Sequence, residues 1–305
     1  MADLGIGISH AIQLDYWRQW KNVLEGKTPM DQYISVIYKD AMEMIKEKQI
    51  AYLYFGNSFC QYNLPSSEEM KTVLTYCGEN EIQMILVTPP VTDFGIEKIR
   101  KLLELFEKGK EPNIVINDFG VLELVKEIGY KGHIILGRVL DKTIREFRLT
   151  DNERNQYYSE RGKDYMDTAA STANCYSAVL KKYNIRRVQM DISDVIYKKN
   201  PELEYDCVLP SEYITTGRMC LFRIAGQSKD EKYLLNDSCK KYCNFQKQML
   251  TKPINYLKFD NDGNRIRELR MIRKGNTLFT MRNSLHALRK MEFSERLVLD
   301  LDMIY

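Results

Sequence analysis

Two patterns of apolar residues, one with helical spacing and one continuous, alternate along the chain from about residue 40. Segments with helical spacing are separated by short, continuous apolar runs that are typical of buried strands. The helical segments are 39–49, 66–77, 96–110, 121–129 and 172–184, and the strand-like runs are 51–57, 82–90, 113–120, 133–140 and 185–192. Continuous apolar strands between helices indicate a parallel sheet that is covered by helices. We therefore predict an α/β fold, first a β/α barrel of the TIM type, regular or irregular, and second an open doubly wound sheet.

The pattern also predicts how the chain is divided. No linker or internal repeat interrupts it, so we expect a single barrel domain over residues 1–305, with an N-terminal extension at 1–39. The stretch 142–167 is rich in charge and tyrosine and reads as a surface insertion. Residues 255–272 read as a hairpin with Asp262 and Gly263 at its turn. We expect 251–305 to form a small C-terminal β appendage and tail.

Composition narrows the class of protein. Hydrophobic residues make up 44% of the 305 positions and charged residues 29%, and no apolar run is long enough to cross a bilayer. No signal-peptide pattern precedes Trp17, so a soluble, cytoplasmic protein is expected. The net charge of +3 is too small to indicate nucleic-acid binding by itself.

The seven cysteines carry the clearest chemical signal. An odd number fits poorly with a disulfide framework, and Cys220, Cys239 and Cys243 lie within one short region. Cys60 follows a predicted strand, and it would share a loop face with Cys220 if residues 219–224 form a strand or strand edge. Four thiolates are the ligand set of a 4Fe-4S cluster or of a tetrahedral zinc ion, and spacing alone leaves these two equal.

The alternative is that each cysteine is a small buried hydrophobic residue. We accept this for Cys77 and Cys175, which lie in predicted helices, and it stays open for Cys207. It fits Cys239 and Cys243 poorly, because the surrounding NDSCKKYC is mostly polar.

Polar side chains follow several predicted strands, which is where β/α barrels place functional residues. The candidates for binding a small anionic substrate are Asn57, Asn117, Asp118, Arg138 and Asp191. Arg138 is the best of them, because a guanidinium can hold a carboxylate through two hydrogen bonds. The alternative, at least as strong, is an internal salt bridge between Arg138 and Asp118 or Asp191.

A basic patch extends over residues 265–290. Its basic residues face one acidic residue, Glu268, and they are Arg265, Arg267, Arg270, Arg273, Lys274, Arg282, Arg289 and Lys290. Such a patch is suited to RNA or to an acidic partner. The commoner alternative is a solvated face of a β appendage.

Several stretches together resemble one known family. YLYFGNSFC, VINDFGVLELVKEIG, HIILGRVLDK and the late cysteine block are similar to the collagenase-like peptidase family, peptidase family U thirty-two, above all to its short, single-domain, iron-sulfur members. The resemblance covers roughly residues 34–283. It implies that Cys60, Cys220, Cys239 and Cys243 bind a 4Fe-4S cluster, and it gives Cys175 no role as a ligand.

The resemblance also implies a function. Relatives that carry clusters take part in oxygen-independent hydroxylation of a quinone precursor or of RNA bases, with prephenate as the oxygen donor, and in one case two family members form a heterodimer. Peptidase activity is an alternative, but His10, His133 and His286 lie in no H-E-x-x-H and beside no G-x-S-x-G. A third hypothesis is a zinc-stabilised, non-catalytic binding subunit.

Overall fold

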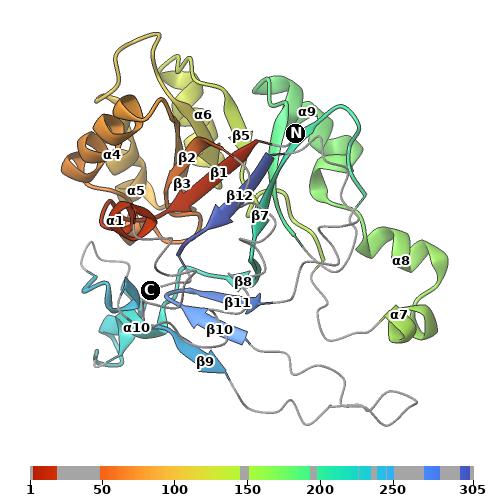
Figure 1. The fold of residues 1–305 in the computed structure, drawn as a ribbon. Helices are drawn as coiled ribbons and strands as arrows, with labels where there is room; N and C mark the ends of the chain where they lie inside the picture. The colour runs from red at the N-terminus through yellow and green to blue at the C-terminus, as the bar shows by residue number, and fades with distance from the viewer. Residues whose placement is uncertain are drawn as a thin grey trace.

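Eight parallel strands close into a barrel, in the order β1-β12-β7-β6-β5-β4-β3-β2 (Figure 1). The structure is a computed structural model that describes residues 3–18, 49–144, 151–192, 198–225, 227–234, 239–244, 246–250, 271–281 and 296–302. The barrel strands are Leu4–Ile8 (β1), Ile50–Gly56 (β2), Gln83–Thr88 (β3), Asn113–Ile116 (β4), Ile134–Leu136 (β5), Arg187–Asp191 (β6), Glu204–Leu209 (β7) and Arg296–Asp300 (β12). The predicted β/α barrel is thus confirmed.

Helices surround the barrel, with α4, α5 and α6 on one side and α7, α8 and α9 on the other (Figure 1). Their bounds are Gln13–Arg18 (α1), Ser67–Glu79 (α4), Asp93–Leu103 (α5), Phe119–Glu127 (α6), Asp151–Tyr157 (α7), Glu160–Met166 (α8), Asn174–Lys182 (α9) and Leu221–Ile224 (α10). Single 3-10 turns lie at Gln61–Asn63 (η1), Ala170–Thr172 (η2), Glu231–Tyr233 (η3) and Tyr242–Asn244 (η4). Helix α4 begins with the reciprocal capping box of Ser66 and Glu69, which satisfies its first free backbone N–H groups.

The barrel interior is filled by side chains that alternate along each strand. Seven of them form a cluster separate from the core that packs between strands and helices: Tyr54, Ile85, Val87, Val115, Ile135, Val208 and Val298. Gly5 on β1 makes room for the largest, because a Cβ atom at Gly5 would lie 2.5 Å from the Tyr54 ring. The barrel is therefore a packed core and not a channel.

A buried cluster of hydrogen-bonded polar side chains adjoins this apolar layer at the Tyr54 hydroxyl. Tyr54 donates a hydrogen bond of 2.5 Å to Asp206, and Arg296 donates one of 2.9 Å to the Tyr54 hydroxyl. Arg187 donates a further bond of 2.9 Å to Asp206. Burial raises the pKa of Asp206, and the two arginines oppose that effect. The partners keep a fully buried carboxyl group hydrogen-bonded, which such groups require.

A second, antiparallel sheet lies across the carboxyl ends of the barrel strands (Figure 1). Its order is β8-β11-β10-β9, formed by Ser211–Thr216, Thr277–Met281, Met271–Lys274 and Gln248–Leu250. Phe279 of β11 meets the ring of Phe59, from the loop after β2, at 5.3 Å between centroids. The small sheet therefore covers the end of the barrel at which functional residues are expected.

The structure corrects three sequence-based boundaries. Residues 4–8, expected within an N-terminal extension, form barrel strand β1. The small sheet begins at β8, well before residue 251, and β12 is no tail but the strand that closes the barrel between β1 and β7. All five residues of β12 are buried. The three apolar residues between Arg296 and Asp300 give no sign by themselves of which sheet they join, because that depends on pairing partners far away in the chain. Residues 219–224, expected as a strand or strand edge, contain the short helix α10 instead.

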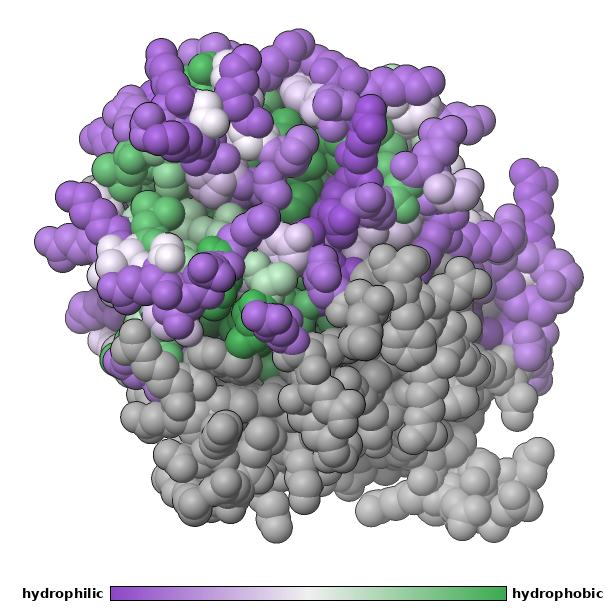
Figure 2. Space-filling view, turned by 45° about the horizontal axis from the view of Figure 1, so that its top comes forward, coloured by the Kyte–Doolittle hydropathy of each residue, from purple (hydrophilic) through white to green (hydrophobic). Residues whose placement is uncertain are grey.

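Other predicted elements are partly or wholly outside the described residues. These are the hairpin turn at Asp262 and Gly263, most of the helix at 39–49, and the N-terminal extension beyond residue 18. The insertion at 142–167 contains helices α7 and α8, where no helix was predicted. Within the ranges that the structure covers, no helix combines the length and apolarity needed to span a bilayer. Figure 2 shows hydrophilic side chains over much of the described surface on the face in view.

Gly56 ends β2 and begins the loop that carries Asn57 and Cys60. Its φ is 125°, and a Cβ atom would lie 2.2 Å from the Val87 carbonyl oxygen. We expect Gly56→Ala to lower the free energy of unfolding by about 2 to 5 kcal/mol, from backbone strain and backbone displacement together. Urea unfolding measures the effect.

Gly78 provides the matched control for this prediction. It lies in α4 with no atom within 4 Å of a Cβ position. Gly78→Ala should therefore raise the free energy of unfolding by about 0.5 to 1 kcal/mol through helix propensity. Equal effects of the two substitutions would contradict the assigned geometry at Gly56.

Candidate functional site

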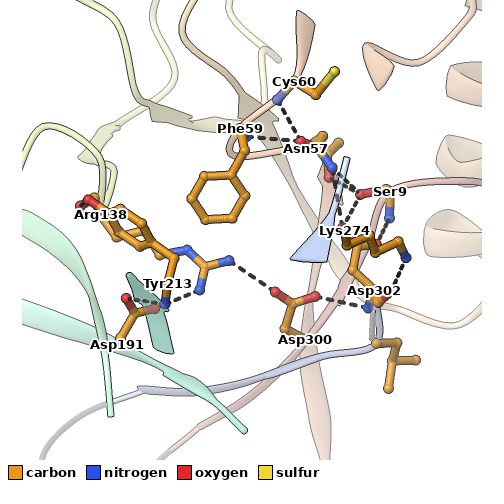
Figure 3. A network of polar contacts seen from close by, with 12 residues as sticks. Ser9, Asn57, Phe59, Cys60, Arg138, Asp191, Tyr213, Lys274, Asp300 and Asp302 are labelled. Carbon is orange, nitrogen blue, oxygen red and sulfur yellow. Dashed lines mark hydrogen bonds and ion pairs between the residues drawn. The ribbon is translucent and has the colours of Figure 1, made fainter. Parts of the chain in front are cut away.

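The mouth of the barrel carries a buried ion-pair network centred on Arg138, in the loop after β5 (Figure 3). Its guanidinium donates to Asp191 at 2.6 Å and to Asp300 at 3.0 Å. The Phe59 ring lies 4.8 Å from the guanidinium carbon, in cation-π contact. Burial alone lowers the pKa of Arg138, but the two carboxylates raise it above its ordinary value. Arg138 is thus a charged group in the centre of the mouth, with both terminal nitrogens bound to carboxylates.

Asp302 joins this network to the first two barrel strands. The Asp302 backbone N–H donates to the Asp300 side chain at 3.0 Å. The Asp302 carboxylate accepts hydrogen bonds from the Ser9 backbone at 3.1 Å and from Asn57 at 3.3 Å, and it contacts the Ser9 hydroxyl. Lys274, at the end of β10, donates to the Asp302 carbonyl oxygen. Residues of β10 and residues that follow β1, β2 and β12 therefore meet at one residue, Asp302.

Asn57 positions the loop that carries Cys60. Its side-chain oxygen accepts from the backbone N–H groups of Phe59 at 2.9 Å and of Cys60 at 2.8 Å. Its amide nitrogen donates to Ser9 at 2.9 Å. The next residue, Gln61, accepts from the Thr92 backbone at 2.8 Å and so ties the loop to the start of α5. Cys60 is held by these bonds on a fixed loop, as a ligand residue requires.

Three other cysteines lie around Cys60. Burial raises the pKa of the Cys60 thiol to about 12; a backbone hydrogen bond from Tyr62 opposes this, and negative charge on Cys243, Cys220 or Cys239 adds to it. For Cys243, burial raises the pKa to about 11, with Cys220 and Cys239 adding to it and Lys274 opposing it. The four predicted ligand cysteines therefore lie within electrostatic range of one another, although they come from segments as far apart as residues 60 and 243.

Local backbone geometry supports each late cysteine. Cys220 is the N-terminal cap residue of α10, and backbone N–H groups of Phe222 and Arg223 hydrogen-bond to its sulfur. The Lys241 backbone N–H lies 3.4 Å from the Cys239 sulfur. Helix α10 packs against η4, which contains Cys243. These contacts place Cys220, at the start of α10, close to Cys243 in η4.

Gly275, at the turn between β10 and β11, packs closely on Cys243. Its φ is 59°, and a Cβ atom there would lie 3.5 Å from both the Cβ and the sulfur of Cys243. In the described part of the chain, no three histidine, cysteine, aspartate or glutamate side chains are placed to hold a single metal ion. The four thiols thus share a neighbourhood without forming a closed one-ion site.

Two cavities flank the Cys60 loop. The larger, of about 440 Å³, is lined by Cys60, Cys243, residues of the ion-pair network and the apolar side chains of Phe59, Phe279 and Ile12. The smaller, of about 230 Å³, is lined by Cys60, Cys220 and Arg218 among others. Phe59, Cys60 and Asn276 belong to both walls. Cys60 therefore stands between a mouth cavity, the name we use for the larger one, and the region of the late cysteines.

The five residues predicted to bind a small anion have different roles. Asn57 lines the mouth cavity. Arg138 and Asp191 form the buried ion pair that the sequence left as the alternative. Asp118 caps α6 by accepting from the Gly120 backbone at 2.7 Å, and it also accepts from Val91 at 3.0 Å. Asn117 donates to the Thr88 carbonyl and accepts from the Val139 backbone. Asn117 and Asp118 thus stabilise loops at the mouth.

The basic patch at 265–290 is described only at Arg273 and Lys274, and its other basic residues lie outside the described ranges. Lys274 lines the mouth cavity and does not belong to a solvated basic face. Cys77 is buried in α4, as predicted, but Cys175 is exposed on α9, so the prediction of a buried residue was wrong there. Cys207 is fully buried on β7, which settles the open choice in favour of a core residue.

Several polar residues of the mouth cavity had no role assigned from the sequence, among them Ser9, Asn63, Glu69, Asp300 and Asp302. His10 follows β1 and lies 3.3 Å from Glu69, on the first turn of α4. A signal for the two aspartates was present, because they follow the apolar run RLVL as other polar residues follow strands. The interpretation of residues 251–305 as an appendage conceals this signal, because it assigns no barrel strand to the residues before the aspartates.

Replacing Arg138 tests how much the ion-pair network contributes to the free energy of unfolding. In Arg138→Met, Asp191 and Asp300 lose their buried partner, so we expect the free energy of unfolding to fall by about 3 to 5 kcal/mol. Arg100→Met is the control, since Arg100 makes surface pairs with Glu97 and Glu127 and should cost about 1 kcal/mol or less. Urea unfolding of both variants tests this, and similar small losses would contradict it.

The pair of Glu69 and His10 predicts a specific pH dependence. The hydrogen bond from His10 lowers the pKa of Glu69 from about 4.5 to about 2, with burial opposing it. Because the folded-state pKa is lowered, this stabilisation is present above about pH 4.5 and is lost as the pH falls toward 2. Glu69→Gln keeps a capping-box residue but removes the charge. We expect wild type to exceed Glu69→Gln in stability by more at pH 6 than at pH 3, and an unchanged difference would refute the assignment.

Comparison with known proteins adds no relative. The chain has no significant match among protein-family profiles, curated proteins or solved structures. Its resemblance to the collagenase-like peptidase family stays a prediction, and the function must be inferred from the residues of the site.

Proposed function

We propose that this chain is a 4Fe-4S cluster-binding protein in which Cys60, Cys220, Cys239 and Cys243 hold the cluster beside the mouth cavity. The observation that carries the proposal is the gathering of these four thiols, from distant segments, around the loop after β2. Four thiolates are the full ligand set of a cubane cluster. The same four residues are those that the family resemblance implies.

The surroundings of the thiols suit such a group. Backbone N–H groups point at the sulfurs of Cys220 and Cys239, and the side-chain nitrogen of Asn63 lies 4.0 Å from the Cys243 sulfur. Hydrogen bonds to ligand sulfur atoms are a means by which proteins tune cluster potentials. Cys220 and Cys243 are buried and Cys60 is half-buried, which would also protect a bound cluster from solvent.

A cluster with four thiolate ligands supplies electron transfer, because none of its irons has an open position. Cys60 and Cys243 line the mouth cavity, so a molecule bound there would lie next to the cluster ligands. A volume of about 440 Å³ is in the range of small-molecule sites. We therefore propose redox modification of a small molecule, with the barrel residues binding and orienting it.

The family resemblance suggests the finer class of reaction. It implies oxygen-independent hydroxylation of a quinone precursor or of an RNA base, with prephenate as the oxygen donor and a second family member as a heterodimer partner. A single ring fits the volume of the mouth cavity. RNA binding through residues 265–290 would depend on basic residues that are largely outside the described ranges.

Peptidase activity has one observation in its favour, because Cys60, His10 and Glu69 line the same cavity. Against it, the Cys60 thiol has a pKa raised to about 12, so at neutral pH it is protonated and a weak nucleophile. The zinc hypothesis uses the same four cysteines, but in the described part of the chain they do not form a closed site for one ion. Elemental analysis separates it from the cluster.

The decisive experiment is anaerobic purification followed by visible absorption and by iron and sulfide analysis. We expect a brown protein with about four irons and four sulfides per chain, as a cubane requires. Cys239→Ala should abolish the absorption, because it removes one of the four ligands.

Cys77→Ala and Cys175→Ala are the matched controls, since the first thiol is buried in α4 and the second is exposed on α9. Both variants should keep iron, sulfide and colour. A colourless protein that contains zinc would refute the cluster, and equal loss of iron in Cys175→Ala would show that the ligands were wrongly chosen.

A further inference from the structure

Two buried polar atoms on the wall of the mouth cavity have no hydrogen-bond partner: Nε2 of His10 and Oδ1 of Asn63. Asn63 is 6% exposed, so its side chain is cut off from bulk water. An unsatisfied buried polar atom costs about 1 to 3 kcal/mol. Other polar side chains of the same wall, such as Ser9, Asn57 and Asn276, have partners within the chain. The two orphan atoms therefore indicate where a ligand makes hydrogen bonds.

The Asn63 orphan atom is a hydrogen-bond acceptor. The Asn63 amide directs its nitrogen toward the Cys243 sulfur, which leaves the oxygen as the unpaired atom. Nδ1 of His10 faces the Glu69 carboxylate, and its Nε2 is the second unpaired atom. A ligand that satisfies the Asn63 oxygen must bring an N–H or O–H donor.

The charges on the wall are mainly negative. Glu69, Asp300 and Asp302 line the cavity, against Lys274 as the lysine among the described lining residues. The basic partners are fewer than the carboxylates, because Arg138 is shared between Asp300 and Asp191, and His10 faces Glu69. Lys274 is also bound to the Asp302 carbonyl oxygen. Such a wall attracts a cation and disfavours a carboxylate ligand.

Apolar side chains complete the cavity. The Phe59 and Phe279 rings meet edge to face with centroids 5.3 Å apart, and Ile12 adds an aliphatic surface. A ligand that matches this wall combines an apolar body with a cationic, donor-rich head. A protonated primary amine has three N–H donors and one positive charge, as the acceptors and carboxylates require.

We propose that the mouth cavity binds a small organic amine, whose ammonium group donates to Asn63 Oδ1 while its apolar body packs on Phe59 and Phe279. The proposal rests on the proposed function in one respect, since it takes the mouth cavity as the reaction site. It replaces the expectation of an anion at Arg138, whose two terminal nitrogens are bound to Asp191 and Asp300. It also departs from the carboxylate oxygen donor, prephenate, that the family resemblance implies.

Three probes with similar bodies and different heads test the ligand class: 2-phenylethylamine, 2-phenylethanol and 3-phenylpropionate. Binding to the purified full chain is measured by anaerobic equilibrium dialysis at pH 7. We expect the amine to bind at least about tenfold more tightly than the carboxylate, equivalent to about 1.4 kcal/mol, with the alcohol between them. The proposal is overturned if the carboxylate binds as tightly as the amine or if none of the probes binds.

Variants at the orphan atoms test the position of the head group. Asn63→Leu removes an acceptor and should weaken amine binding about 5- to 30-fold, as the loss of one hydrogen bond to a charged group would. Asn63→Asp keeps the shape and adds negative charge, so it should tighten binding of the amine and weaken that of the carboxylate. The control is Asn155→Leu, at an exposed position on α7. Unchanged amine affinity in both Asn63 variants would overturn the proposal.

Iron and sulfide analysis of the same wild-type samples separates this proposal from the cluster assignment, because amine binding and iron content are then measured independently on one protein. Amine binding without iron in the wild type would refute the proposed cluster alone. Iron without a preference for the amine would refute the ligand class alone.

Discussion

Closure of the barrel by β12 is the constraint on which the site depends. This strand pairs in parallel with β1 on one side and with β7 on the other, from Leu4 opposite Leu297 to Leu299 opposite Leu209. Its carboxyl end thereby delivers Asp300 to Arg138 and Asp302 to Ser9, Asn57 and Lys274. Without that pairing the guanidinium would be buried beside one carboxylate, and the loop with Cys60 would lose its link to the end of the chain. The hydrogen bonds of the sheet thus determine the electrostatics of the mouth.

Asn57 connects the two parts of the proposed site. Its amide nitrogen bonds to the Asp302 network, and its oxygen holds the backbone at Phe59 and Cys60. The Phe59 ring then contacts Arg138 on one side and Phe279 of the small sheet on another. A change in the charge or position of the ion pair would therefore reach Cys60 through two successive contacts. The thiols and the mouth cavity form one continuous assembly of packed residues.

The small sheet contributes as much to this assembly as the barrel does. Its β10–β11 turn places Lys274 and Gly275 against Asp302 and Cys243, and β8 leads directly to Cys220. Tyr213 of β8 also donates to the Arg138 carbonyl at 2.9 Å. In a β/α barrel the site is usually formed by loops at the carboxyl ends of the strands. Here an additional sheet covers those ends, and it buries the thiols and partly encloses the mouth cavity.

The sequence by itself determined the elements whose signals are local. The runs that form β2 to β6 are short, apolar and flanked by turns, and a capping box and helical spacing indicate α4. The four cysteines were also identified from sequence, because thiols in polar surroundings have few structural explanations. Only the tertiary structure decided that residues 296–300 close the barrel and that buried carboxylates balance the charge of Arg138. It also decided that His10, Asn63 and Glu69 line the same mouth cavity. These outcomes depend on contacts between distant residues, such as Arg138 with Asp300, 162 positions apart, and Ser9 with Asp302, 293 apart. Local propensity has no information on such pairs, since their proximity is created by strand order and not by spacing along the chain.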